Sequence, residues 1–440
     1  MKERLSDVVA AVVIVLIAFV GEQPLSAQLA HASATTLGLS GNNTATVRGL
    51  GAISVNPAGL AMEGSNFSLA LFPTQVRSNL DPIHLADLSD VQRMVIPEAT
   101  KDEWLTRVTT EGGQTGSFGV DISEVAVTSG NVGLQVSTIM VGAFSLPPGV
   151  VEGLLYGNAG RTGSPSRLDL TNASLEGFAI STAGLSIGIP VPVSSMEMAV
   201  GLTVKYSIGH DVFVGQSTNS SIEDGPVRAH LNLPMVQAAD GYIADLMSSK
   251  LRWKVPQSNG SGFGIDAGFM MKRGSFAFGA SVQNIFNNFS WDTSKLKYRP
   301  GTVLLEFGQN SSDFALTPYV SAPASLRALI DRMTFEPTFR AGASLDLTTD
   351  LTLSGDFHRQ ARSPGISLSS KSHMGLGVEF RGMKVLHLRA GAAVITDGMQ
   401  YGGGASLVLG PMNLSIAGAL QMGVLAEKGL GQVTLSFGGR

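Results

Sequence analysis

Residues 196–208 alternate without a break between two kinds of side chain. In the stretch MEMAVGLTVKYSI the even positions, from Met196 to Ile208, are large and apolar, and the odd positions, from Glu197 to Ser207, are small or polar. Successive side chains of a β-strand point to opposite faces of a sheet. The period of two therefore predicts a strand with one apolar face and one polar face.

The same alternation returns along most of the chain. It is clearest in three strand pairs, at residues 263–282, 339–357 and 374–394, each around a short turn. Strands of about 9 to 13 residues cross an apolar band of ~25 Å when they are tilted. We count about fourteen such strands. Weaker alternation within residues 301–319 leaves a count of sixteen open.

The first 27 residues differ from the rest. Lys2 and Arg4 precede an uncharged apolar core from Val8 to Val20, and Ala27 follows as a small residue suited to cleavage. This pattern predicts a cleaved signal peptide, because the core is shorter than the ~20 residues that a spanning helix needs. A retained N-terminal anchor is the alternative. Beyond this segment, no apolar run approaches about 18 residues, so membrane-spanning helices are not expected.

Residues 28–64 show no strand alternation and are rich in Gly, Asn, Ala and Thr. The sequence Asn56-Pro57-Ala58-Gly59 predicts a turn, since proline fixes one φ angle and glycine permits a positive one. We expect this segment to be a hatch or plug, and residues 65–440 to form the wall of a barrel. The first strand is expected at residues 66–77, followed by helices within residues 84–109.

Connection lengths give the wall a direction. Counted back from the C-terminus, the turns at 348–350, 381–384 and 410–411 are short, and the connections 359–371, 395–400 and 423–430 are expected to be longer. Outer-membrane barrels have short periplasmic turns and longer outer loops. Continuing this alternate count of connections places segments 78–115, 209–261 and 284–334 on the outer side. Short helices are expected there at residues 231–251 and 322–333.

Composition agrees with a barrel in a membrane. Mean hydropathy is +0.21 and 15% of residues are charged, which is apolar for a secreted protein. The chain has no cysteine, so no disulfide stabilises it, and its net charge of −4 does not suggest a nucleic-acid partner. The chain has 3 Trp and 6 Tyr but 20 Phe. Either Phe forms the aromatic girdles that barrels carry at the membrane interfaces, or the barrel sits unusually in the membrane.

Three stretches resemble a known family. SVNPAGLA at residues 54–61 resembles the hatch motif of the fatty-acid-transporter (FadL-like) outer-membrane superfamily. FGIDAGFMMKRGSFAFGASVQNIFNN at residues 263–288 and RAGASLDLTTDLTLSGDF at residues 340–357 resemble its strand pairs, which also occur in the PorV-like proteins of type IX secretion. The resemblance implies an all-β, transmembrane, antiparallel β-barrel of about fourteen strands with an N-terminal hatch and short helices in outer loops. Only Asn56, Pro57, Ala58 and Gly59 match a motif with an implied role.

Strand parity also predicts which charged residues face the lumen. These are Glu197, Lys205, Asp266, Arg340, Asp356, His358, His373, Glu379 and Arg389. His358 and His373 flank one loop and are expected to be neighbours. His387 shares their side and is expected near Val378, roughly 15 Å from His373 at ~3.3 Å per residue. A hydrated lumen with scattered charges is the favoured interpretation over an acid–base or metal site.

The function predicted from these features is transport in the outer membrane of a Gram-negative-type bacterium. We expect a transporter or channel for small hydrophobic molecules, in contact with outer-membrane lipid. The alternatives are a PorV-like component of a secretion system, with secretion-machinery proteins as partners, a structural barrel without cargo, and an extracellular β-sandwich. We expect no enzymatic activity, no cofactor and no metal.

Overall fold

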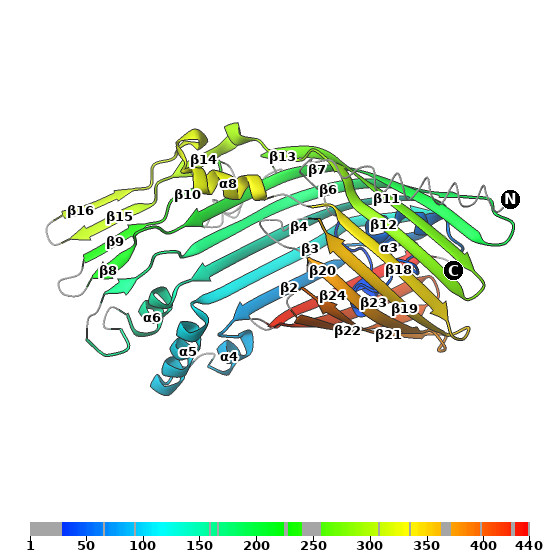
Figure 1. Cartoon of the computed structure of the whole chain (residues 1–440), viewed down its shortest axis with the longest axis horizontal. Coiled ribbons are helices and arrows are strands. Elements are labelled where there is room, and N and C mark those ends of the chain that lie inside the picture. The colour runs from blue at the N-terminus through cyan, green and yellow to red at the C-terminus, as the bar shows by residue number, and fades with distance from the viewer. Residues whose placement is uncertain are drawn as a thin grey trace.

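The protein is built mostly of β-strands, which close into one barrel (Figure 1). The computed structural model describes residues 29–64, 67–91, 94–157, 160–164, 167–223, 228–239, 257–306, 309–333, 336–361, 371–396, 398–423 and 427–438. The expected signal peptide, residues 1–27, lies outside this part of the chain. Among the described helices, none combines the length and the apolar character needed to cross a membrane.

The wall has fourteen antiparallel strands, with β1 and β2 together forming the first. Each strand pairs with its neighbours in sequence order, and β24 closes the barrel by pairing with both β1 and β2. This confirms the predicted barrel. The strands are β1 (Ser68–Leu71), β2 (Thr74–Asp81), β3 (Gln114–Ser129), β4 (Val132–Leu146), β6 (Ser174–Pro190), β7 (Glu197–Gln216), β11 (Gly260–Arg273), β12 (Phe276–Asn287), β18 (Thr338–Asp346), β19 (Leu351–Gln360), β20 (Ser372–Phe380), β21 (Leu386–Ile395), β22 (Gly398–Leu409), β23 (Met412–Gly423) and β24 (Glu427–Gly438).

The first strand is interrupted where the sequence predicted a continuous one. Phe72 adopts a φ of 54°, in the left-handed region, and Pro73 follows without a backbone N–H to donate. The hydroxyl of Thr74 donates to the carbonyl of Phe72 at 2.9 Å. Because β1 and β2 both pair with β3 and β24, the barrel stays closed across the break.

The wall buries many polar positions and exposes many apolar ones, although β6 and β7 also bury apolar side chains such as Phe178 and Val212. In β7, Leu202 and Val204 are 42% and 46% exposed, whereas Thr203 and Lys205 are 0% and 1% exposed. The polar side chains thus face the interior, as alternation predicted, and the apolar side chains face outward.

Phenylalanine marks both rims of the outward apolar band. Phe276 and Phe286 stand near opposite ends of β12 and are 45% and 49% exposed. Ten residues along a strand span about 33 Å, or roughly 25 Å of height at a tilt of ~40°. That height matches the apolar band of outer-membrane barrels. Trp104 and Trp291 are buried instead, so Phe supplies the girdle residues on this strand.

Long connections gather at one end of the barrel, which we call the long-connection end, and the opposite end is the short-turn end. Helices α4 (Leu85–Asp90) and α5 (Glu98–Glu111) lie in the first connection, as predicted. The second connection, residues 147–173, was not predicted to be long; it holds α6 (Pro148–Tyr156). The expected longer connections at 395–400 and 423–430 are wrong, because β22 begins three residues after Ile395 and β24 begins four residues after Gly423. Residues 362–370 of the connection 359–371 lie outside the described part.

A second sheet projects from the long-connection end, in the strand order β16-β15-β9-β8-β5. Its strands are β5 (Leu168–Asp169), β8 (Ser221–Glu223), β9 (Arg228–Asn232), β15 (Thr302–Glu306) and β16 (Gln309–Asp313). The alternation within residues 301–319 therefore adds no strand to the wall. The helix expected at 231–251 is wrong in its described part, where β9 and β10 (Met235–Ala238) lie; residues 240–251 are not described. Residues of β10 such as Met235 and Val236 pair with β7 and with the short strand at residues 296–299 instead of forming a helix.

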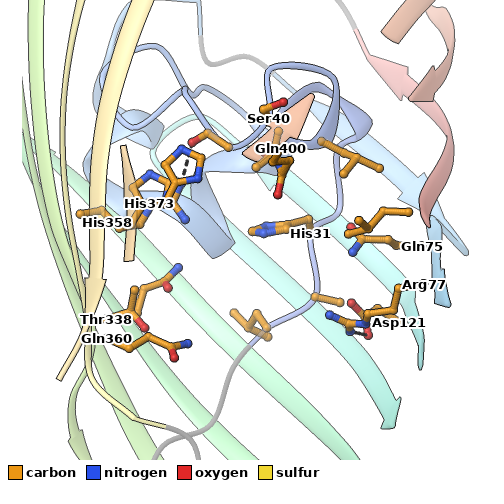
Figure 2. A pocket seen from close by; sticks show the side chains of 18 of the residues that line it. His31, Ser40, Gln75, Arg77, Asp121, Thr338, His358, Gln360, His373 and Gln400 are labelled. Atoms are coloured by element: carbon orange, nitrogen blue, oxygen red, sulfur yellow. Dashed lines mark hydrogen bonds and ion pairs between the residues drawn. The ribbon is translucent and has the colours of Figure 1, made fainter. Parts of the chain in front are cut away.

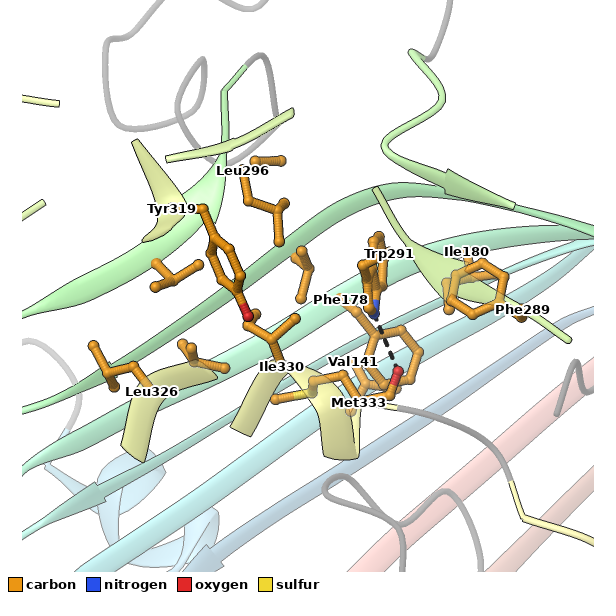
Figure 3. Packing of buried hydrophobic residues seen from close by; sticks show 14 of the residues in the cluster. Val141, Phe178, Ile180, Phe289, Trp291, Leu296, Tyr319, Leu326, Ile330 and Met333 are labelled. Carbon is orange, nitrogen blue, oxygen red and sulfur yellow. Dashed lines mark hydrogen bonds between the residues drawn. The ribbon is translucent and has the colours of Figure 1, made fainter. Parts of the chain in front are cut away.

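The helix expected at 322–333 is confirmed as α8 (Ala324–Arg332), and it covers an apolar cluster (Figure 3). Leu326 and Ile330 of α8 pack with Phe178 of β6 and Val212 of β7. The Trp291 indole donates to the carbonyl of Met333 at 3.1 Å. The short elements around the cluster are β13 (Ser290–Trp291), η3 (Thr293–Lys295), β14 (Leu296–Arg299), β17 (Thr317–Pro318) and η4 (Tyr319–Ser321).

Candidate functional site

Residues 29–64 cross the interior of the barrel, and we call them the inner segment. The segment contains α2 (Ala34–Gly38), α3 (Leu50–Val55) and the 3-10 helix η1 (Pro57–Ala61). Helix α2 contacts β21 to β24, whereas η1 contacts β6, β7 and β11 on another side of the wall. The segment therefore bridges strands that are distant from each other around the barrel.

The Asn56-Pro57-Ala58-Gly59 turn is tied to the wall. The Asn56 amide donates to the carbonyls of Thr44 and Phe269, both at 3.1 Å, and its oxygen accepts from the Ala58 N–H at 3.2 Å. Asn56 thus caps η1 and anchors it to β11 at once. Glycines make room for this approach, because a Cβ on Gly268 would lie 2.1 Å from the Asn56 oxygen.

Two charged wall residues that were predicted to face the lumen, Asp356 and Arg340, hydrogen-bond to the inner segment. The Asp356 carboxylate accepts from the Thr44 N–H at 2.8 Å. The Arg340 guanidinium donates to the Thr44 hydroxyl at 3.2 Å and to the Gly41 carbonyl at 3.0 Å. Hydrogen bonds that involve a charged group are about twice as strong as neutral ones, so residues 41–44 are firmly placed.

His358 and His373 lie directly opposite each other on β19 and β20, as predicted. Their rings stack with centroids 4.4 Å apart and planes at 7°. A His373 ring nitrogen contacts the Asn42 oxygen at 3.0 Å, and a His358 nitrogen lies 3.4 Å from the Asp356 carboxylate. The predicted register of His387 is wrong: Leu388 pairs with Phe380, so His387 lies beyond the end of that pairing and far from the histidine pair.

The other predicted charges are paired rather than scattered. Lys205 and Asp266, both buried, lie 2.6 Å apart. Arg389 donates to Glu379 at 2.8 Å. Glu197 accepts from the backbone N–H of residue 63 in the inner segment. A wall with matched charges can bury them without the cost that an isolated charge would carry.

A cavity of about 120 Å³ lies between the inner segment and the wall, on the side of the long-connection end (Figure 2). His31, Ser40 and the histidine pair line it, and glutamines surround them. Its polar lining comprises His31, Thr36, Ser40, Gln75, Arg77, Asp121, Gln283, Thr338, Arg340, His358, Arg359, Gln360, His373, Gln400 and Gln421. The alternation of the wall strands is the sequence signal that also places glutamines inward, whereas the residues predicted to face the lumen were all charged.

Three arginines and one aspartate line the cavity, and one of the arginines has the aspartate as its partner: Arg77 pairs with Asp121 across neighbouring strands. Burial, together with Arg340 and Arg77, lowers the pKa of His31 to about 3, so its imidazole is neutral at physiological pH. A His31 ring nitrogen lies 3.2 Å from the Ser54 hydroxyl. Within the described residues, no group of three or more His, Cys, Asp or Glu is arranged to hold a metal ion.

Comparison with known proteins places the fold. No family model and no curated protein matches the chain. The Ralstonia pickettii toluene transporter TbuX aligns with a TM-score of 0.51 and 11% identity over 93% of this chain and 98% of that one. The P. putida toluene transporter TodX aligns at 0.49 with 9% identity (94% and 99% covered), and a Pseudomonas aeruginosa FadL homologue at 0.47 with 11% identity (94% and 99% covered). The alignment with TbuX and the closed fourteen-stranded wall agree: the chain has the fold of the FadL-like outer-membrane β-barrels.

Proposed function

We propose that this protein is an outer-membrane transporter or channel for small hydrophobic molecules, with the inner segment as its hatch. The observation that carries the proposal is the cavity between the inner segment and the wall, inside a barrel with an apolar outward face. Ligand sites are typically concave and largely pre-formed. The structural neighbour TbuX is described as a toluene transporter, which supports the same class of cargo here.

The proposed orientation puts the long-connection end outside the cell, because outer loops of such barrels are the longer ones. The cavity then lies on the outer side of the hatch, where an incoming molecule arrives first. The first 27 residues serve as a cleaved signal peptide for export. Passage further inward requires the hatch to shift, since its contacts with Arg340 and Asp356 fix residues 41–44 against the wall.

Uptake by living cells tests the proposal, because the outer leaflet of the outer membrane is the barrier that such a transporter must overcome. The chain is expressed in a Gram-negative host whose own importer of hydrophobic molecules has been deleted, and the initial uptake of labelled oleate and toluene is measured. We expect faster uptake of at least one of them than in cells with empty vector. Equal rates for both would refute the function, provided that the folded barrel is found in the outer-membrane fraction.

An introduced disulfide tests the role of the hatch. The chain has no cysteine of its own, and a Cβ on Gly38 would lie 3.5 Å from the Arg389 Cβ, within the range that disulfides adopt. The double substitution Gly38→Cys with Arg389→Cys is expected to link the hatch to β21. Uptake should fall on oxidation and return on reduction, while each single variant stays insensitive to oxidation. Undiminished uptake in the oxidised double variant would show that transport does not require the hatch to separate from the wall at this point.

A further inference from the structure

The size of the cavity suits a single ring. An apolar cavity of ~150 Å³ in another protein stays dry and binds benzene. The cavity here is slightly smaller, at about 120 Å³, and it is bounded by the inner segment on one side and by wall strands on the other. A long chain would have to extend beyond it, whereas a monocyclic molecule is close to its size.

The lining differs from that of a benzene site. Leu29, Leu37, Ile139 and Leu430 supply an apolar part. The remainder is dominated by histidine and glutamine side chains, which come from opposite sides of the cavity (Figure 2). A hydrocarbon that displaced water from these groups would leave their hydrogen bonds unmade, which is unfavourable. A ring with a hydroxyl group would restore both a donor and an acceptor.

Two of the three arginines in the lining already have partners, and the third, Arg359, is exposed. Arg77 pairs with Asp121, and Arg340 is occupied by Thr44 and Gly41 of the inner segment. The acceptor groups are numerous: the side-chain oxygens of Gln75, Gln283 and Gln400 belong to residues that line the cavity. A carboxylate would meet these oxygens, and Arg359 is the cation that it could approach, so a comparison with benzoate decides between a neutral ligand and an anion.

His31 stands near the centre of the cavity, between the histidine pair and the Gln75–Arg77–Asp121 side (Figure 2). Its Nδ1 contacts the Ser54 hydroxyl. A neutral imidazole offers one donor and one acceptor, so its second nitrogen, Nε2, is available for a hydroxyl group in the cavity. The Gln432 amide donates to the His31 carbonyl at 2.6 Å and fixes the backbone of this residue.

We infer that the cavity selects single-ring hydrophobic molecules that carry a neutral hydrogen-bonding group, with phenols as the class, over plain hydrocarbons of the same shape. The inference rests on the proposed function and names its cargo. His31 is the residue assigned to bind the hydroxyl group of the ligand, and the apolar side chains Leu29, Leu37 and Leu430 contact its ring.

A matched pair of labelled compounds tests this. p-Cresol and toluene differ by one hydroxyl group, and each is supplied to the same host cells, with the rate in empty-vector cells subtracted. We expect the protein-dependent initial uptake of p-cresol to exceed that of toluene by about tenfold, which corresponds to ~1.4 kcal/mol. A benzoate arm should show less protein-dependent uptake than p-cresol.

Variants of His31 separate binding from folding. His31→Leu is expected to reduce the p-cresol to toluene uptake ratio by about tenfold, whereas His31→Gln keeps most of the preference. His230→Leu, an exposed histidine on the second sheet, is the matched control and should change nothing. The His31 variants must show the same heat-modifiable gel mobility as the parent, which confirms a folded barrel.

The outcomes are distinguishable. If toluene or oleate enters the cells but p-cresol has no advantage, or if His31→Leu leaves the ratio unchanged, the inference is wrong and the proposed function stands. If benzoate enters faster than p-cresol, the site selects anions and the inference is again wrong. If none of these molecules enters faster than in empty-vector cells, the proposed function fails as well.

Discussion

Replacing Asn56 with alanine is expected to loosen the inner segment and leave the wall intact. The Asn56 side chain is fully buried and makes three hydrogen bonds, to the backbone of Thr44, Phe269 and Ala58. Each contributes about 1 kcal/mol net, so their loss costs the local structure ~3 kcal/mol. The wall keeps its own ladder, because residues 267–272 of β11 still pair with both β7 and β12.

Amide hydrogen exchange measures this local loss. An energy of ~3 kcal/mol corresponds to an exchange rate about a hundredfold higher for amides that open with the segment. We expect that increase in peptides covering residues 41–60 and no change in those covering 398–423. Asn56→Asp keeps the acceptor for Ala58 and loses both donors, so residues 41–47 should be affected more than residues 58–60. Asn310→Ala, on an exposed strand of the second sheet, is the control.

Two results would refute the reasoning. Unchanged exchange at residues 41–60 in Asn56→Ala would mean that these three hydrogen bonds do not hold the segment. An equal increase in the segment and in β22 and β23 would mean that the segment and the wall open together, as one cooperative unit.

Three further predictions concern buried groups. Lys205→Met should lower the temperature at which the folded gel band disappears, because the Asp266 carboxylate is then buried without its cation, at a cost of about 3–5 kcal/mol. Combining Lys205→Met with Asp266→Asn should recover part of the lost thermal stability. Gly268→Ala should disturb the turn of the inner segment and raise its protease sensitivity, since the new Cβ meets backbone and side-chain atoms, whereas Gly429→Ala, with open space around it, should not. Burial lowers the pKa of His31 from 6.5 to about 3, so the stability that its neutral form contributes is complete above pH 6.5 and falls as the pH drops towards 3. Between pH 7 and pH 5 this loss of stability is about 2 kcal/mol. His31→Gln should therefore reduce the change in melting temperature between these two pH values.

The sequence predicts the wall well because strand geometry is local. The alternation at Leu202, Thr203 and Val204 depends only on the two faces of one strand, and burial follows it. The same holds for α8, whose apolar positions recur with helical spacing. Residues 231–238 show the limit of such patterns, because short apolar runs at a helix-like spacing form β9 and β10 once neighbouring strands are available to pair with them.

The candidate site is predicted less completely, because its partners are set by distant contacts. The alternation of the strands assigns Arg340 and Asp356 to the interior. Their partners are backbone and hydroxyl groups of the inner segment, whose sequence has no repeating pattern from which its structure could be predicted. The register of His387 depends on the length of the turn after Phe380, and an error of a few residues moves it along the barrel. The cavity itself arises from how the inner segment packs against the wall.

The hydrogen bond between Gln432 and the carbonyl of His31 joins residues 401 positions apart. It means that a residue at the start of the described part of the chain receives a contact from the last strand of the wall. Contacts of such large sequence separation form late in folding, because a long loop must close first. The same strand closes the barrel by pairing with β1 and β2, so the closure of the barrel and this anchoring of the inner segment depend on one strand.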